Sequence, residues 1–454
     1  MDGHLPRLCL TIRCDRGKYW LSSVLLLMKA RGTLLAPVLA ASVLRCDATS
    51  PNVDRLPPVV QAVVAPSGAA AFVPTDTLEI SVTGSDETAL AWIGYELGSP
   101  AGVRDSAAVS GTGAQHSFRV ALRAEWAESR ISVSAIAQDA GGNRGTRLQT
   151  PIEVINAVRR PMVGVRLPAQ PYDVAYDAPR GRLYVSIPDS NRLVVVDLAS
   201  RSLAPPILLW GRPWGLDLTP SGDSLVVALR RGFSLALVNL LTGFVDTLAL
   251  NMTGGLGEGP ARVCVMKNRK VLYITDFDGF GYGNDIRKFD LQTRADSVVF
   301  AGFGIDQYGF IARDQRREYG IVLDNRSASF YSAISNSFGS VLQTTGEHFP
   351  SVAADSSLHW LVGNTLYDRD LNLIVNLHPP GYEYGPTAFS PDGRTAFLAA
   401  YRSYFRVPVP SAVGPRVFVP LTPQRLWYLA DRDVVVATTY DATSSEWRVW
   451  LIGP

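Results

Sequence analysis

The sequence predicts an all-β protein with two folded domains, a β-sandwich followed by a seven-bladed β-propeller that an N-terminal strand closes. Two observations carry this prediction. Short alternating segments with turn residues between them run through residues 58–156, a spacing typical of a sandwich. From residue 157 onward a strand–turn–strand pattern returns about every 42 residues, and a repeat of this period with four strands per unit is typical of propeller blades.

The composition fits a folded chain with many short strands. Of the 454 residues, 47% are hydrophobic and 19% are charged, which excludes a disordered chain and supplies enough apolar material for a sizeable core. The 39 glycines and 30 prolines are scattered as turn residues. The formal net charge is +2, so neither nucleic acid nor an anionic membrane surface is an expected partner.

The first 46 residues have the features of a targeting segment. After Met28, the basic residues Lys29 and Arg31 precede an apolar run at 33–44, which has the length of a secretory signal. We therefore expect export to the periplasm or another extracytoplasmic part of the cell envelope, with translation starting at Met28. An uncleaved membrane anchor is the alternative, although the two basic residues interrupt the apolar stretch.

A cysteine follows this segment directly. Cys46 precedes Asp47, and the pair resembles the lipid-modified site of bacterial lipoproteins. Arg45 departs from that pattern, because the family has a small residue there. The resemblance implies lipidation at Cys46 and contact with the membrane only through this lipid or an N-terminal anchor.

Residues 47–57 are polar and rich in turn residues, as expected of a linker to the sandwich at 58–156. The late segment of this domain carries Ala137, Asp139, Gly142 and Asn143. These residues resemble the "A-x-D-x-A/G-G-N" ending of a strand in bacterial immunoglobulin-like domains, and Asp86 fits an earlier turn of the same family. The expected strands are 59–64, 78–82, 91–97, 117–122 and 131–137, with Trp92 and Tyr95 in or near the core.

Asp86 and Asp139 allow two interpretations. Carboxylates at sandwich loops are suitable ligands for calcium. Aspartate in turns also bonds commonly to its own backbone, and this is the favoured interpretation, so no cofactor is expected and calcium is the alternative. The cysteines Cys9, Cys14, Cys46 and Cys264 leave a single thiol in the folded body, which excludes a disulfide framework and predicts a buried structural Cys264.

The propeller domain is expected at residues 157–454. The last repeat has only three strand segments, whereas residues 162–167 supply an additional strand before the first repeat. We expect this strand to pair with residues 447–452 and close the ring, which removes two open sheet edges. The repeats begin at Pro171, Pro213, Pro260, Tyr308, Pro350, Pro386 and Pro423.

Two segments of these repeats carry a family resemblance. Residues 213–227 read PWGLDLTPSGDSLVV, and residues 194–200 read VVVDLAS. They resemble the YVTN-type propellers of the quinoprotein and lactonase-like group, and the resemblance extends over residues 160–454. It implies an extracytoplasmic binding or scaffold protein, although the fold does not by itself fix a function.

The candidate binding site is the mouth of the central channel. In a propeller, the loop that enters each innermost strand lies at this mouth, where residues of mixed charge and aromatic walls would form a concave site. Solvated loop residues with local hydrogen bonds are the alternative interpretation. The candidates are Tyr172, Asp173, Arg212, Trp214, Glu258, Arg262, Asp306, Tyr308, His348, Tyr384 and Arg425.

Two functions remain open. The first is an exported, monomeric, non-enzymatic protein whose propeller mouth engages a protein or a glycan. The second is a metal-dependent propeller hydrolase of the lactonase type, whose metal would need carboxylate ligands at the mouth. Arg212, Arg262 and Arg425 alternate with those carboxylates and disfavour a divalent cation, and the chain has no G-x-S-x-G, H-E-x-x-H or P-loop motif. The non-enzymatic function is therefore favoured.

Overall fold

The computed structural model describes residues 54–66, 71–251, 259–276, 284–305, 309–323, 327–343, 351–377, 379, 385–411 and 413–454. Regular structure in this part is almost entirely strand, with 3-10 turns at Ala124–Trp126 and Pro188–Ser190, so the all-β prediction is confirmed. The described residues contain no helix of the length and apolarity that crossing a membrane requires. The predicted signal and Cys46 lie outside the described residues.

The first folded part is built from three sheets around one hydrophobic core. Strands alternate buried and exposed residues, as Leu78, Ile80 and Val82 do in β3, because one face of each sheet is packed and the other solvated. Tyr95 is buried edge-to-face against Phe118, at a centroid distance of 5.1 Å. The sheets are β1 (Val59–Ala65), β3 (Thr77–Ser85) and β6 (Gly113–Ala121); β5 (Arg104–Ala108), β4 (Leu90–Leu97), β8 (Val133–Asp139) and β9 (Arg144–Leu148); and β2 (Ala71–Phe72), β10 (Ile152–Val154) and β7 (Ser129–Ile131).

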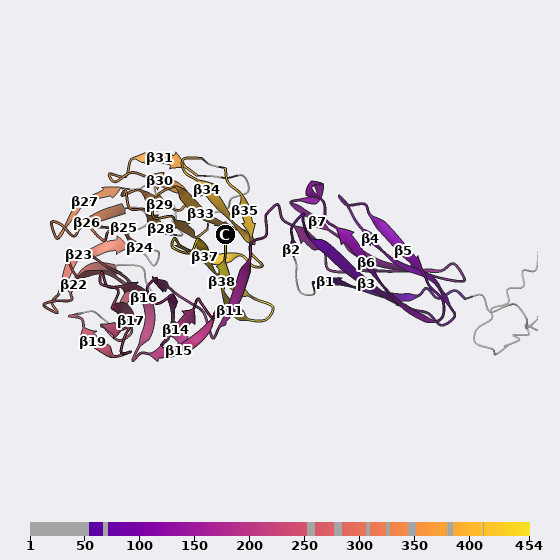
Figure 1. Ribbon diagram of the computed structural model, residues 1–454, viewed down its shortest axis with the longest axis horizontal. Coiled ribbons are helices and arrows are strands. Elements are labelled where there is room, and N and C mark those ends of the chain that lie inside the picture. Colours follow the sequence, from indigo (N-terminus) through magenta and orange to yellow (C-terminus); the bar gives the residue numbers. More distant parts are fainter. Residues whose placement is uncertain are drawn as a thin grey trace, which may run out of the picture. The chain divides into compact units, whose positions relative to one another are not determined.

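The second folded part is a β-propeller (Figure 1). Its described residues form seven antiparallel four-stranded sheets, which follow one another along the chain. In the order from the innermost strand outward, the first three are β12 (Val174–Asp177), β13 (Arg182–Ile187), β14 (Arg192–Asp197) and β15 (Ser202–Leu208); β16 (Arg212–Leu218), β17 (Ser224–Arg230), β18 (Ser234–Asn239) and β19 (Val245–Ala249); and β20 (Gly259–Val265), β21 (Lys270–Asp276), β22 (Asn284–Asp290) and β23 (Asp296–Ile305).

The fourth to seventh sheets have the same order. They are β24 (Phe310–Arg313), β25 (Tyr319–Leu323), β26 (Ser327–Ser332) and β27 (Ser337–Gln343); β28 (Val352–Ala354), β29 (Trp360–Val362), β30 (Thr365–Tyr367) and β31 (Leu373–Asn376); β32 (Thr387–Phe389), β33 (Thr395–Ala400), β34 (Ser403–Pro408) and β35 (Arg416–Phe418); and β36 (Pro423–Leu429), β37 (Val434–Asp441), β38 (Glu446–Ile452) and β11 (Met162–Leu167).

The second strand of a sheet is apolar over most of its length. Leu183 to Ile187 of β13 are all buried, and so are Leu225 to Leu229 of β17. Both faces of these strands pack against neighbouring sheets, so the sequence shows a continuous hydrophobic run in place of an alternation. Each pair of consecutive sheets shares a hydrophobic cluster, and the seventh sheet shares one with the first.

Strand β11 completes the last sheet. It pairs antiparallel with β38, from Met162 opposite Ile452 to Leu167 opposite Trp447, as the sequence predicts. Val165 and Leu167 are buried in the cluster that joins the seventh sheet to the first. The ring is therefore closed by hydrogen bonds between the beginning and the end of the propeller sequence.

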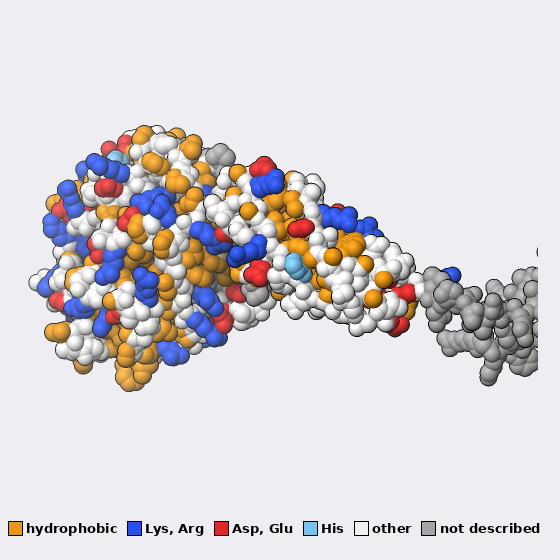
Figure 2. Space-filling model, turned by 45° about the vertical axis from the view of Figure 1, so that its right-hand side comes forward, with side chains coloured by type: hydrophobic (Ala, Val, Ile, Leu, Met, Phe, Trp, Pro, Cys, Tyr) orange, Lys and Arg blue, Asp and Glu red, His pale blue; other side chains and the backbone are white. Residues whose placement is uncertain are grey.

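Charged groups of both signs are mixed over the surface. On the face that Figure 2 shows, Lys and Arg side chains are interspersed with Asp and Glu. The visible face carries no single broad basic region, which agrees with the small net charge of +2.

Candidate functional site

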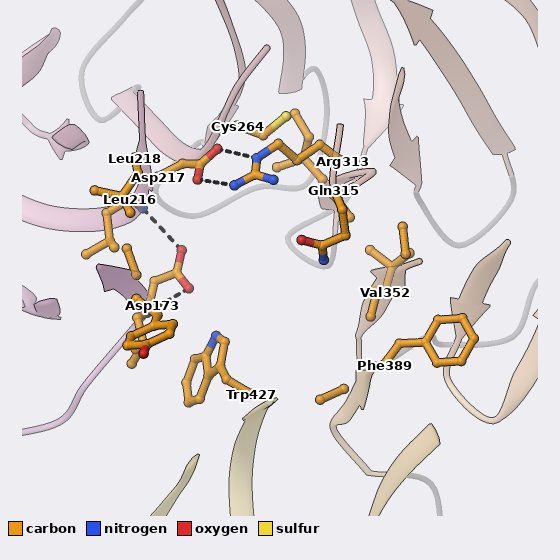
Figure 3. A pocket seen from close by; sticks show the side chains of 18 of the residues that line it. Asp173, Leu216, Asp217, Leu218, Cys264, Arg313, Gln315, Val352, Phe389 and Trp427 are labelled. Atoms are coloured by element: carbon orange, nitrogen blue, oxygen red, sulfur yellow. Dashed lines mark hydrogen bonds and ion pairs between the residues drawn. The ribbon is translucent and has the colours of Figure 1, made fainter. Parts of the chain in front are cut away.

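The innermost strands line two neighbouring cavities in the central channel. The larger cavity has a volume of about 480 Å³ and the smaller one a volume of about 180 Å³. Asp173, Val263, Val352 and Trp427 line both, and Figure 3 shows the larger cavity with Asp173 and Trp427 on one side and Val352 and Phe389 on the other. Both polar and apolar side chains therefore line the channel.

Asp173 stands just before β12 and is held by backbone groups. Its Oδ1 accepts a hydrogen bond from the N–H of Val174 at 2.9 Å, and its Oδ2 accepts one from the N–H of Leu216 in the next sheet at 3.1 Å. Burial raises the pKa of Asp173, although these two bonds and the charges of Arg262 and Arg425 oppose the shift. The carboxyl group is therefore fixed in direction and partly desolvated.

Two arginines from different sheets reach one aromatic ring. Arg262 of β20 and Arg425 of β36 place their Cζ atoms 5.4 Å and 5.7 Å from the ring centroid of Tyr172. Arg262 also lies 4.4 Å from the ring centroid of Phe310. Tyr172 also packs against Trp214, with 4.3 Å between the ring centroids. These separations lie in the range of cation–π and aromatic pairing.

No acidic group among the described residues lies within ion-pair distance of either guanidinium group, although the charge of Asp173 attracts both. Neither Arg262 nor Arg425 makes an ion pair or a hydrogen bond in the described part of the chain, and their contacts are with aromatic rings. Burial lowers the pKa of Arg425, and repulsion from Arg262 lowers it further. A guanidinium withdrawn from water without a hydrogen-bond acceptor is unfavourable, so the pair is an attractive site for an anion.

The structure places some of the predicted mouth residues close together. Tyr172, Asp173, Arg262 and Arg425 come together around or beside the smaller cavity. Trp214 packs against Tyr172. The Arg230 Cζ atom lies 4.1 Å from the centroid of the Trp214 ring. Arg212 is exposed and lines neither cavity. Of the remaining candidates, the following lie outside the described residues: Glu258, Asp306, Tyr308, His348 and Tyr384.

A buried ion cluster deeper in the channel was not anticipated. Asp217 of β16 accepts two hydrogen bonds from Arg313 of β24, at 2.7 and 2.8 Å, and one from Arg317 at 3.2 Å. Its Oδ2 also accepts the N–H of Val265 in β20 at 2.8 Å. Burial alone would raise the pKa of Asp217, but the two arginine charges outweigh it and lower the pKa. The cluster thus joins the second, third and fourth sheets.

These residues are not among the sequence-predicted candidates, because those candidates come from the loops that enter the innermost strands. Asp217 and Arg313 lie at the far ends of β16 and β24. The available signal was a charged residue within an otherwise apolar inner strand. Phe310 and Trp427 also belong to inner strands, and both line the smaller cavity.

Cys264 lines the larger cavity without being reactive. Its side chain is buried, as the sequence predicts. Burial, together with the charge of Asp217, raises its pKa to about 12. A thiol with such a pKa is a poor nucleophile at neutral pH.

The sandwich brings its aspartates together. Carboxylate oxygens of Asp54, Asp86 and Asp139 lie within 4.8 Å of one another. The Thr88 hydroxyl lies 2.7 Å from Asp54 and 2.8 Å from Asp86, and the Asn143 amide donates to Asp139 at 2.8 Å. Asp86 and Asp139 also accept hydrogen bonds from the backbone N–H groups of Thr88 and Asn143, at 2.9 and 2.8 Å, and these are the turn interactions that the sequence favours.

Comparison with known proteins gives only distant likenesses. No family model matches the chain, and no curated protein shows significant similarity to it. The β-propeller domain of Cps50 (Swd1) from Myceliophteria thermophila is 10% identical over 64% of this chain and 99% of that domain, with a TM-score of 0.47. Regucalcin from Agrobacterium tumefaciens, described as a calcium-binding protein, is 11% identical over 64% of this chain and 92% of its own, with a TM-score of 0.42.

Similarity at this level carries no functional argument. The assignment of a β-propeller rests on the sheet order, the shared hydrophobic clusters and the pairing of β11 with β38 within this chain. The class that fold and site define is an all-β protein in which a propeller encloses a cationic and aromatic cavity.

Proposed function

We propose that this chain is an exported, non-enzymatic binding protein whose propeller mouth engages a protein or a glycan. In this proposal the first part is an immunoglobulin-like domain, and the second is a seven-bladed propeller of the YVTN type. The N-terminal segment, with lipid on Cys46 or as an anchor, attaches the monomer to the cell envelope, and the sandwich holds the propeller away from the membrane.

A single observation carries the proposed binding site. Arg262 and Arg425 approach one aromatic ring beside a cavity of about 180 Å³, and neither has an acceptor among the described residues. Two neighbouring, half-buried cations destabilise the folded chain unless something offsets their repulsion. The faces of Tyr172 and Phe310 offset part of it, and a bound anion would offset the rest. The arrangement is better suited to binding than to stability.

The test is partner capture by crosslinking in native cell envelopes. We expect the wild-type chain to retain a partner that the double variant Arg262→Ala, Arg425→Ala loses. Arg212→Ala is the matched control, because Arg212 is exposed and lines neither cavity. Identical partner sets for the wild type and the double variant would remove the channel mouth from the proposal.

The hydrolase is the second candidate and makes a different prediction. It requires a metal at the mouth, yet in the described part of the propeller no three acidic, histidine or cysteine ligands lie within metal-binding distance of one another. Elemental analysis of the purified chain distinguishes the two functions. Stoichiometric zinc or calcium that persists in Asp139→Asn would revive the hydrolase, whereas calcium that this substitution removes would belong to the sandwich.

A further inference from the structure

The cationic pair spans the mouth of the channel. Arg262 belongs to the third sheet and Arg425 to the seventh. In a closed ring of seven sheets, these positions face each other across the axis, and both side chains reach the Tyr172 ring that precedes the first sheet. A group bound between the two guanidiniums would therefore be held from two sides.

Among the described residues, the charges that line the smaller cavity are unequal in number. They are the two guanidinium groups and one carboxyl group, that of Asp173. Each oxygen of Asp173 already accepts a backbone N–H. A guanidinium presents several N–H donors in a planar fork that matches a carboxylate or a phosphate. One singly charged anion would satisfy both arginines and balance the site.

The remaining lining indicates what the anion is attached to. Asp173 retains lone pairs that can accept a hydrogen bond from a hydroxyl group, and Phe310, Val352 and Trp427 present apolar surface. A cavity of about 150 Å³ accommodates a six-membered ring, and the smaller cavity here, with about 180 Å³, shares lining residues with the larger one. The site thus offers an acceptor for hydroxyl groups, an apolar wall and two guanidinium groups that can bind a carboxylate. These features are complementary to an acidic sugar ring.

We propose that Arg262 and Arg425 form a carboxylate subsite for an acidic sugar, a uronic acid residue of a glycan, with Asp173 accepting its hydroxyl groups. This inference rests on the proposed binding function and selects the glycan over the protein partner. The sugar ring occupies the smaller cavity, and the larger cavity receives the next part of the glycan.

Calorimetric titration of the full chain with glucuronate and galacturonate tests the proposal. We expect one of the two to bind, and the neutral sugars glucose and galactose to bind at least tenfold more weakly, because they leave both guanidiniums unpaired. Arg262→Met and Arg425→Met should each weaken uronate binding about ten- to hundredfold, the range for a hydrogen bond to a charged group. Arg212→Met is the control and should leave the affinity unchanged.

Asp173→Asn separates a sugar site from a simple anion site. Removing a negative charge beside two arginines should tighten the binding of inorganic phosphate. The same substitution should weaken uronate binding, because the carboxylate acceptor for its hydroxyls becomes a weaker amide acceptor. Asp173 also accepts backbone hydrogen bonds, so the substitution could affect folding. The affinities of Asp173→Asn are therefore compared with those of the wild type if the two proteins melt at the same temperature.

Three results would overturn the inference. They are equal affinity for uronate and phosphate, tighter binding of a polyglutamate peptide than of either uronate, and uronate binding that survives both arginine substitutions. The first indicates a plain anion site and the second an acidic protein partner. Envelope capture that still depends on Arg262 and Arg425 would in each case leave the proposed function standing.

Discussion

At the scale of single residues, two carboxyl groups in one channel show opposite behaviour. Burial dominates at Asp173 and raises its pKa, whereas Arg313 and Arg317 dominate at Asp217 and lower its pKa. The difference lies in direct pairing, since Asp217 accepts two hydrogen bonds from Arg313 while Asp173 accepts only backbone N–H groups. We infer that Asp217 serves stability and that Asp173 remains available to a ligand.

Replacing Asp217 should destabilise the propeller strongly. Asp217→Ala leaves two partly buried arginines without their partner, and breaking such a pair typically lowers the unfolding free energy by about 3–5 kcal/mol. The midpoint of urea unfolding measures the effect. Asp246→Ala, which breaks a pair with the exposed Arg294, should change the unfolding free energy by less than about 1 kcal/mol. Similar losses in the two variants would contradict the structural role of Asp217.

The stability at acidic pH should depend on Asp290. Burial would raise its pKa, but hydrogen bonds from Lys270 and from the N–H of Gln292 lower it to about 2. Because the folded pKa lies below the ordinary value of 3.8, the ionised group stabilises the fold above that value. This contribution is lost as the pH falls from about 4 to about 2.

Denaturant unfolding at pH 5 and pH 2.5 tests this dependence. We expect the wild type to lose on the order of 1–2 kcal/mol more than Asp290→Asn over this interval. Asp370→Asn, at an exposed turn position, is the matched control and should follow the wild type. An Asp290→Asn curve parallel to the wild-type curve would show that the Lys270 pair contributes nothing.

The sequence allowed part of the candidate site to be predicted, for a topological reason. Tyr172, Asp173 and the residues at 262 and 425 lie at or near the beginnings of inner strands, so the repeat alone assigned them to one end of the channel. The pairing of Asp217 with Arg313 joins residues in different sheets. Such a contact depends on the angle between sheets, which no local pattern encodes.

At the scale of elements, the inner strands approach one another closely at a glycine. A Cβ atom on Gly215 of β16 would lie 2.6 Å from the Arg262 Cα, 2.8 Å from the Ala261 carbonyl oxygen and 2.9 Å from the Val263 nitrogen. All three atoms are backbone atoms of β20 and cannot move aside independently. The position of Arg262 at the mouth therefore depends on the absence of a side chain at residue 215.

Gly215→Ala should separate β16 from β20 and displace Arg262. We expect a loss of about 1–3 kcal/mol of stability, as for overpacked cores, together with weaker uronate binding. Gly339→Ala is the matched control, because its Cβ would meet no atom closer than 3.8 Å. Thermal unfolding and calorimetry measure the two effects, and unchanged affinity in a stable Gly215→Ala variant would show that Arg262 does not depend on this spacing.

The length of its strands determines how clearly a sheet can be seen in the sequence. The second sheet has inner strands of seven residues, and its segment 213–227 carries the clearest repeat pattern. In the fifth sheet β28, β29 and β30 contain three residues each. Three residues are too few to show the alternation or the apolar run by which a strand is recognised in a sequence.

At the scale of the whole molecule, closure of the ring is expected to determine stability. A chain beginning at residue 171 lacks β11, whereas a chain beginning at residue 157 retains it. Without β11, the edge of β38 is open and the burial of Val165 and Leu167 is lost, about 1.5–3 kcal/mol for each side chain. The shorter chain should therefore melt well below the longer one. Equal melting temperatures would show that closure does not stabilise the ring.

The pairing of β11 with β38 also sets the order of events during synthesis. Strand β11 leaves the ribosome before any other strand of the propeller and has no partner until β38 follows. Sheets in between can form one by one, since each is built from consecutive strands, but the last sheet joins segments distant in sequence, a slow step in folding. The propeller therefore remains an open arc until its last strand has been made.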